Sequence, residues 1–196
     1  RLADSYRGGR IIREGFKIVI GGRPNAGKSS LFNVLLGLSR ALVAPTAGTT
    51  RDYLSEWVEI NGFGVNLLDT AGLRATTRSR LEQAGQAMTE DVMSGADLVL
   101  WMFDLSRRSV WPELQEDISW LGEAPRLLVG NKLDLAPQSE AMALDRAGEE
   151  VILVSCKTGR GISRLKESIG RRIESVMPDM TDGLAVTSAR HASNLG

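Results

Sequence analysis

Hydrophobic residues in this chain alternate between short continuous runs and stripes that repeat every three or four residues. The runs, rich in Val, Ile and Leu, are typical of strands that are buried on both faces. The stripes are typical of helices that pack one face against a core. The runs predict strands over residues 16–20, 97–104, 126–129 and 151–154, and the stretches on either side of Asn61-Gly62 predict strands over residues 53–60 and 63–68. The stripes predict helices that include residues 31–38, 81–92, 114–121, 141–147 and 162–176.

The order of these elements predicts an α/β fold. Strands that alternate with helices usually form a parallel sheet with helices on both faces. The pair Asn61-Gly62 stands between two predicted strands and is a strong signal for a hairpin, which makes one strand antiparallel. We therefore expect a three-layer fold around a mostly parallel six-stranded sheet.

Residues 22–29, GRPNAGKS, connect the first predicted strand to the first predicted helix. Their spacing is that of a phosphate-binding P-loop, in which glycines let the backbone approach a phosphate closely. Backbone N–H groups and the positive end of the helix then face the anion. Lys28 is expected to reach the β- and γ-phosphates, and the Ser29 hydroxyl to bind Mg²⁺. The candidate nucleotide-binding residues here are Asn25, Ala26, Gly27, Lys28, Ser29 and Ser30.

A second motif, DTAG at residues 69–72, follows the third predicted strand. Downstream of a P-loop, D-x-x-G predicts that Asp69 holds Mg²⁺ through a water and that the Gly72 N–H approaches the γ-phosphate. The two motifs in this order indicate the Ras-like class of P-loop NTPases. Each stands at the carboxyl end of a strand, where open α/β sheets bind their ligands.

Residues 131–134, NKLD, follow the fifth predicted strand and point to guanine. Guanine presents two donors side by side, N1–H and the 2-amino group, and the Asp134 carboxylate can accept both. Adenine would leave this charged acceptor unpaired, at a cost of about 1–3 kcal/mol or more. Asn131 is expected to tie this loop to the P-loop, and the Lys132 stem to cover the purine face.

Residues 155–157, SCK, follow the last predicted strand. They match the S-A-K element that supplies backbone N–H groups to guanine O6, so Ser155, Cys156 and Lys157 complete the candidate base site. Cys156 stands where alanine is usual. We interpret it as a packed thiol rather than a nucleophile.

Composition restricts the function further. The 196 residues carry a formal net charge of zero, so no global field attracts nucleic acid. A single cysteine excludes an intrachain disulfide, and no apolar stretch has the length of a membrane span. These features favour a cytoplasmic protein that does not enter a membrane. The histidine, His191, is interpreted as a surface residue of the C-terminal tail.

The chain divides into three expected parts. Residues 1–14 are interpreted as the end of a preceding helical segment whose arginines line a solvated face, and residues 15–177 as the nucleotide-binding domain. Residues 178–196 are interpreted as the start of a following helical segment. Because the first residue is Arg1 rather than Met, we expect a piece of a longer protein.

The motifs above, together with GTTRD at residues 48–52, resemble the G domain of the MnmE (TrmE) family of tRNA-modification GTPases. The resemblance covers roughly residues 10–177 and extends to flanking residues 6–10, YRGGR, and 189–191, ARH. It implies hydrolysis of GTP to GDP and phosphate, with Mg²⁺ and K⁺ as cofactors. It also implies that hydrolysis drives conformational change during modification of the tRNA wobble uridine (U34), with MnmG as a partner protein.

The group that activates water needs an explanation, because Leu73 stands where Ras-like GTPases carry a water-orienting glutamine. Either the site hydrolyses GTP poorly or another polar group does this work. The resemblance implies that two G domains dimerise and that a K⁺ ion, held partly by Asn25, replaces an arginine finger. It further implies that a glutamate of the second switch orients the water, and Glu82, in an E-x-x-G motif, is the candidate. Thr50 is the candidate switch threonine on Mg²⁺, with Thr49 as the alternative.

Two other functions stay open. Ribosome-assembly GTPases of the Der and Era type share the P-loop asparagine and a hydrophobic residue after D-x-x-G. A GTP-binding scaffold with little turnover would also agree with Leu73 and with residues 75–81, which lack the acidic residues that usually precede the glutamate in the MnmE family. The Glu82 motif and the flanking segments favour a K⁺-stimulated GTPase that is activated by dimerisation.

Overall fold

The computed structural model describes residues 10–11, 14–38, 54–69, 95–107, 110–136 and 150–177. The strands are β1 (Phe16–Gly22), β2 (Leu54–Ile60), β3 (Phe63–Asp69), β4 (Leu98–Asp104), β5 (Arg126–Asn131) and β6 (Val151–Leu153). The helices are α2 (Lys28–Leu38), α5 (Val110–Leu121) and α7 (Ile162–Val176). The helices expected around residues 81–92 and 141–147, the tail that contains His191 and most of segment 1–14 lie outside the described residues.

The six strands form one sheet in the order β2-β3-β1-β4-β5-β6. Four neighbouring pairs are parallel, and β2 runs antiparallel to β3. This is the α/β architecture that the alternating pattern predicts, a mostly parallel sheet with one antiparallel strand. The fold class of a Ras-like P-loop NTPase is therefore confirmed.

The antiparallel strand comes from the predicted hairpin. Asn61 and Gly62 join β2 to β3 with φ angles of 51° and 84°. Two consecutive residues with positive φ are what a two-residue type I′ turn requires, and Asn-Gly adopts that turn with little strain. The side chain of Asn61 also donates a hydrogen bond of 2.9 Å to the backbone oxygen of Lys166, which fastens the turn to α7.

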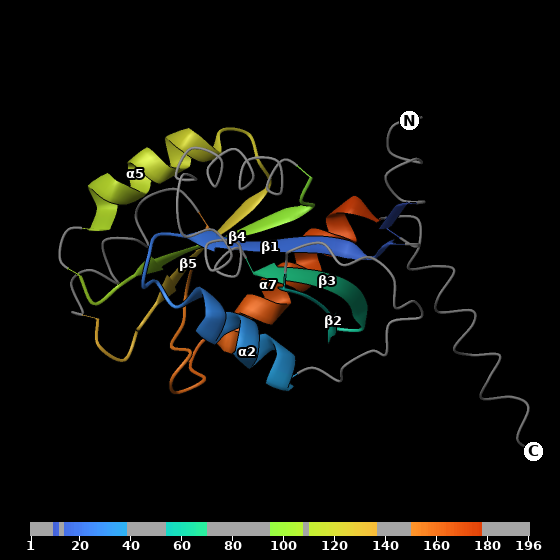
Figure 1. The fold of residues 1–196 in the computed structure, drawn as a ribbon, viewed down its shortest axis with the longest axis horizontal. Coiled ribbons are helices and arrows are strands. Elements are labelled where there is room, and N and C mark those ends of the chain that lie inside the picture. The colour runs from blue at the N-terminus through green and yellow to red at the C-terminus, as the bar shows by residue number, and fades with distance from the viewer. Residues whose placement is uncertain are drawn as a thin grey trace, which may run out of the picture.

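Helices cover both faces of the sheet, with α5 on one side and α2 and α7 on the other (Figure 1). Consecutive residues of β1 serve both layers, because side chains alternate across a strand. Ile18 and Ile20 are buried in the core under α2 and α7, whereas Val19 is buried in the core under α5. This two-sided burial explains why the predicted strands appear in the sequence as continuous apolar runs.

The helix predicted over residues 31–38 is confirmed as part of α2. Its buried residues include Leu31, Phe32 and Leu35. Leu38 shares their helical spacing, but it is the last residue of α2 and is 60% exposed.

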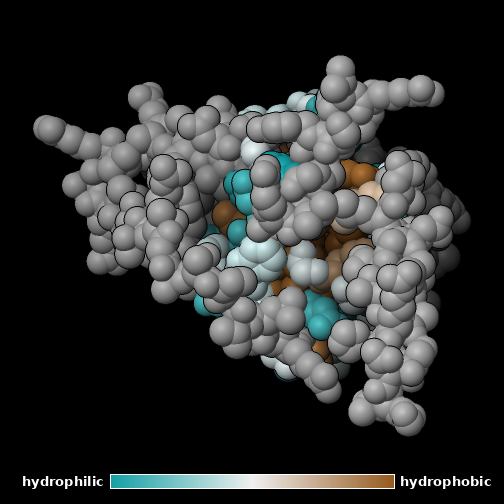
Figure 2. All heavy atoms as spheres, turned by 90° about the vertical axis from the view of Figure 1, so that its right-hand side faces the viewer, coloured by the Kyte–Doolittle hydropathy of each residue, from teal (hydrophilic) through white to brown (hydrophobic). Residues whose placement is uncertain are grey.

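The amino end of the sheet is held by the buried carboxylate of Asp97, which is 2% exposed. It accepts a hydrogen bond of 2.9 Å from the backbone N–H of Lys17 and forms an ion pair with Arg10. Arg10 was expected on a solvated face, so the structure corrects that interpretation. Figure 2 looks at the molecule from this side and shows hydrophilic and hydrophobic residues close together. Among the described helices, none combines the length and the apolar character that crossing a membrane requires.

Candidate functional site

The motifs singled out in the sequence lie at one edge of the sheet. In the strand register, Ile20 of β1 pairs with Asp69 of β3, and Asp104 of β4 pairs with Asn131 of β5. Parallel strands end on the same side, so the P-loop after β1, the end of β3 and the turn after β5 are neighbours. This edge is where open α/β sheets hold ligands.

Two glycines of the P-loop have backbone conformations that residues with a side chain rarely adopt. Gly22 has a φ of 136° and Gly27 a φ of 96°. A Cβ on Gly22 would lie 2.1 Å from the backbone oxygen of Met102, and one on Gly27 would lie 2.2 Å from Nδ2 of Asn131. The loop therefore passes directly against β4 and β5, a close approach that only glycine permits.

Lys28, the first residue of α2, turns its side chain back into the P-loop. Its Nζ donates hydrogen bonds of 3.0 Å and 2.9 Å to the backbone oxygens of Gly22 and Arg23, and the residue is 9% exposed. A buried ammonium needs such acceptors. A phosphate in the loop would offer it charge-assisted hydrogen bonds, which are stronger than those to neutral carbonyls.

Asn131 joins three segments that are distant in sequence. Its Nδ2 donates to the backbone oxygen of Ala26 at 2.9 Å, and its Oδ1 accepts from the backbone N–H of Cys156 at 3.1 Å. Its own backbone oxygen accepts from the N–H of Leu105 at 2.9 Å. The side chain is 3% exposed. The expected link to the P-loop is present, and the link to the SCK segment is an addition that the motif alone does not indicate.

The carboxylate of Asp134 is held by a buried serine. The Oγ of Ser155, which is 0% exposed, donates a hydrogen bond of 2.7 Å to Oδ1 of Asp134. This bond lowers the pKa of Asp134, although the residue itself is exposed. The result is an ionised acceptor with a fixed orientation, which is what recognition of two adjacent N–H donors requires.

Lys132 is anchored at its far end. Its backbone has a φ of 64°, and its Nζ donates to Oδ2 of Asp104 at 2.6 Å. Ser106 donates to Oδ1 of the same carboxylate from both its N–H and its Oγ. Burial alone would raise the pKa of Asp104, but the hydrogen bonds from Lys132 and Ser106 outweigh it and lower that pKa. Cover of a purine by the Lys132 stem stays a prediction.

Cys156 and its neighbours in the SCK segment differ in exposure. Burial raises the pKa of the Cys156 thiol to about 11, so the thiol is protonated at neutral pH. Its side chain packs against the core under α2 and α7. Both features agree with a packed thiol, since a nucleophilic cysteine needs a lowered pKa. Lys157 is exposed, as are Asn25, Ser29 and Ser30 of the phosphate side.

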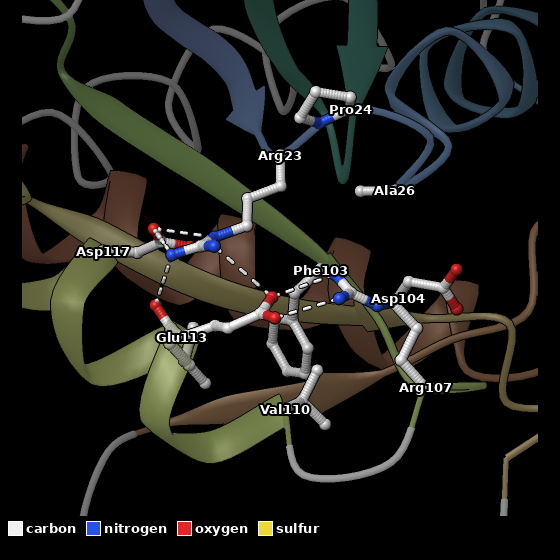
Figure 3. A pocket seen from close by; sticks show the side chains of 10 residues that line it. Arg23, Pro24, Ala26, Phe103, Asp104, Arg107, Val110, Glu113 and Asp117 are labelled. Carbon is white, nitrogen blue, oxygen red and sulfur yellow. Dashed lines mark hydrogen bonds and ion pairs between the residues drawn. The ribbon is translucent and has the colours of Figure 1, made fainter.

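Arg23 is a residue that motif reasoning missed. Its guanidinium extends from the P-loop to α5, where Nε lies 3.0 Å from both carboxylate oxygens of Asp117 and Nη2 donates to the backbone oxygen of Glu113 (Figure 3). The hydrogen bond to Asp117 is the main reason why the pKa of Arg23 is raised. The sequence carried one signal, because acidic residues stand at positions 113, 116 and 117 on one helix face.

Some residues at this edge are suited to metal ions. Ser29 offers a hydroxyl and Asp69, 4% exposed at the end of β3, offers a carboxylate, both of them oxygen ligands that Mg²⁺ prefers. Within the described part of the chain, no three His, Cys, Asp or Glu side chains form a metal-binding group. Asn25 offers an amide oxygen for K⁺.

The remaining candidates lie outside the described residues. They are Thr49, Thr50, Gly72, Leu73 and Glu82. Their proposed roles on Mg²⁺, on the γ-phosphate and on the attacking water therefore stay predictions.

Comparison with known proteins places the site in context. A family profile described as "50S ribosome-binding GTPase" matches residues 17–132. The chain is 46% identical over 174 residues to the tRNA modification GTPase MnmE of Symbiobacterium thermophilum, covering 87% of this chain and 38% of that protein. It is 40% identical over 196 residues to MnmE of Akkermansia muciniphila, covering 100% of this chain and 41% of that protein. The chain thus spans about two fifths of the length of these relatives.

Solved structures give the same fold. The G domain of the T. maritima FeoB iron transporter superposes with a TM-score of 0.59 at 27% identity, over 81% of this chain and 98% of that one. A variant of Aquifex aeolicus Era bound to GDP and AlF4⁻ superposes with a TM-score of 0.53 at 28% identity, over 78% of this chain and 55% of that one.

Proposed function

The chain belongs to the 50S ribosome-binding GTPase family and is thus a GTP-hydrolysing domain, and we propose that it supplies the GTPase step of a tRNA-modification enzyme. The observation that carries the nucleotide assignment is the position of Asn131. This one buried side chain bonds to the P-loop at Ala26 and to the SCK segment at Cys156. A base held next to Asp134 would therefore have its phosphates over the P-loop.

The chain's own groups divide the work of binding. The N–H groups of the P-loop and the ammonium of Lys28 receive the phosphates, and the Asp134 carboxylate selects guanine. Mg²⁺, held by Ser29, Thr50 and, through water, Asp69, would neutralise charge on the β- and γ-phosphates when bound. Gly72 is assigned to the γ-phosphate, and Thr49 is the alternative to Thr50.

The finer features of the proposal come from the resemblance to MnmE proteins. K⁺ bound in part by Asn25 stimulates hydrolysis, two G domains dimerise, and Glu82 orients the attacking water that Leu73 cannot hold. The protein acts in the cytoplasm on the wobble uridine of tRNA, together with MnmG. The support for this setting is the name of the curated relatives at 46% and 40% identity.

A role in ribosome assembly is the second candidate. The description of the matching family profile and the likeness to Era favour it. The curated relatives span this chain over 87% and 100% of its length and carry the other function in their names, so we place tRNA modification first. A scaffold with little turnover is the third reading, and the experiment below separates it from both.

The experiment is GTP hydrolysis measured in K⁺ and in Na⁺ buffer of equal ionic strength over a range of protein concentrations. We expect faster turnover in K⁺, and turnover per molecule that rises with protein concentration because the active form is a dimer. Equal rates in both salts at every concentration would contradict the K⁺ proposal. Binding of GTP without turnover in either salt would favour the scaffold.

A further inference from the structure

Arg23, a residue of the P-loop, is bound to three acidic residues of α5. Besides Asp117 and the backbone of Glu113, its Nη2 lies 3.2 Å from the Glu116 carboxylate and its Nη1 lies 3.4 Å from the Glu113 carboxylate. The spacing of these acidic residues, i, i+3 and i+4, puts all three on the face of α5 that meets the loop. The guanidinium, a planar fork with five donors, suits such a set of acceptors.

The acceptors are themselves fixed in place. The indole Nε1 of Trp101, on β4, donates a hydrogen bond of 3.0 Å to Oδ2 of Asp117, whose side chain is 12% exposed. Glu113 is held from its other side by Arg107, which makes two hydrogen bonds of 2.9 Å to its carboxylate. Figure 3 shows the two arginines on either side of Glu113. Contacts within the protein thus orient the clamp, by which we mean Glu113, Glu116 and Asp117.

The space enclosed by the clamp does not suit a ligand. The cavity between Arg23, the end of β4 and α5 has a volume of about 20 Å³, which is room for about one water molecule. The clamp therefore acts on Arg23 itself and does not form a second binding pocket.

The backbone of Arg23 connects the clamp to the phosphate site. Its carbonyl oxygen accepts a hydrogen bond of 2.9 Å from Nζ of Lys28, the lysine expected on the phosphates. The preceding residue is Gly22, which lies against the backbone of β4 and cannot carry a side chain there. The Arg23 peptide has little freedom to move, because Gly22 packs against β4 and the Arg23 side chain is bound to α5.

We infer that Arg23 is a positioning residue, which through the acidic clamp of α5 holds the start of the P-loop where Lys28 meets the nucleotide phosphates. The inference rests on the proposed GTP function and adds to it a coupling between α5 and the phosphate site. In this inference Arg23 acts through Lys28, because its own guanidinium is bound to α5. Loss of the clamp is expected to weaken the hold on the phosphates and to leave the choice of base unchanged.

The experiment compares Arg23→Gln with Arg107→Gln. The second variant is a matched control, because it removes an arginine that binds the same Glu113 but lies outside the P-loop. The KM for GTP, kcat and the affinities for GTP, GDP and ITP are measured for both variants and for the unchanged chain. ITP lacks the 2-amino group, so the ratio of GTP to ITP affinity reports on the base site alone.

For Arg23→Gln we expect KM to rise and the affinities for GTP and GDP to fall about tenfold, which corresponds to about 1.4 kcal/mol. The ratio of GTP to ITP affinity stays the same, and Arg107→Gln stays within about twofold of the unchanged chain. A merely structural role would instead lower the fraction of folded protein, which reduces the apparent kcat and leaves KM unchanged. Urea unfolding extrapolated to zero urea gives the free energy of unfolding, from which that fraction follows independently.

A second variant, Arg23→Lys, keeps the charge and protects the comparison if Arg23→Gln does not fold. Lysine keeps the charge but lacks the planar fork of arginine. The affinity of Arg23→Lys for GTP should therefore lie between those of the unchanged chain and Arg23→Gln. GTP binding by the Arg23 variants that equals the unchanged chain would overturn the inference, and so would an equal loss in Arg107→Gln. If the unchanged chain itself fails to bind GTP, the proposed function fails, and the inference fails with it.

Discussion

The base half and the phosphate half of the candidate site are held together in different ways. On the base side, Ser155 bonds directly to Asp134, and Asn131 bonds to Cys156. These contacts join loops that would themselves touch the base. On the phosphate side, Lys28 is bonded to carbonyls of its own loop, and Arg23 is fastened to a helix behind the loop.

The difference lies in what fixes the charged group of each half. The base side already presents its selecting carboxylate in a fixed, ionised state. The phosphate side holds its lysine with two hydrogen bonds to carbonyls of its own loop. The key charged group is thus oriented by a side-chain hydroxyl on the base side and by backbone carbonyls on the phosphate side.

The largest effect is expected where the two halves meet, at Asn131. Asn131→Ala leaves the carbonyl of Ala26 and the N–H of Cys156 unpaired at a buried position, each at a cost of about 1–3 kcal/mol. We expect the free energy of unfolding to fall by roughly 2–4 kcal/mol and GTP affinity to fall by about a hundredfold. Urea unfolding and equilibrium binding measure the two effects.

Asn66→Ala is the matched control, because it removes the same side chain from β3. The Oδ1 of Asn66 is buried and has no hydrogen-bond partner among the described residues. Its loss should change GTP affinity by less than about twofold and cost less stability than the loss of Asn131. Similar effects of the two variants on GTP affinity would mean that Asn131 does not join the two halves.

The next effect concerns the base half alone. Asp134→Asn replaces an ionised acceptor by an amide that cannot accept from both N1–H and the 2-amino group. The affinity for GTP should fall at least about tenfold, and the preference for GTP over ITP should shrink with it. XTP, which has a carbonyl in place of the 2-amino group, should gain affinity because the amide can donate to it. Competition binding of the three nucleotides is the measurement.

Ser155→Ala is a milder version of the same change. The carboxylate keeps its charge but loses the hydrogen bond that orients it, so about a threefold loss of GTP preference over ITP is expected. An unchanged preference in Asp134→Asn would remove Asp134 from the base site.

Most of the fold could be predicted because its signals are local. Continuous apolar runs identified four of the strands, and Asn61-Gly62 with the stretches on either side of it identified the hairpin strands β2 and β3. Strand β5 extends to Asn131, two residues past the predicted end at 129, because Gly130 and Asn131 pair with β4 although neither is an apolar strand former. The end of a strand depends on how far it pairs with its neighbouring strand, and the local sequence pattern does not show that pairing.

The motif residues of the site could be predicted because phosphate and guanine each demand particular groups at particular spacings. The residues that support them could not. Arg23 and Asp117 are 94 positions apart, and Asp104 and Lys132 are 28 positions apart. Each pair forms only because the strand order brings β1, β4 and β5 side by side. A charged residue within a motif does not reveal its partner until the topology is known.

The last effect is on stability alone and is a pH dependence at the pair of Asp104 and Lys132. The pKa of Asp104 is lower in the folded protein than its ordinary value of 3.8, because the hydrogen bonds from Lys132 and Ser106 outweigh burial. The stabilisation from this pair is therefore fully present above about pH 4 and is lost as the pH falls through the lowered pKa.

Asp104→Asn should cost about 1 kcal/mol of unfolding free energy near pH 7. Urea unfolding between pH 7 and pH 3 should show the two proteins converging at the acidic end. A gap that stays constant over this range would mean that the cost of Asp104→Asn comes from the amide N–H₂ group, which faces the donors of Lys132 and Ser106, and not from the lost negative charge. The ion pair between Asp104 and Lys132 would then contribute nothing to the electrostatics of the base half.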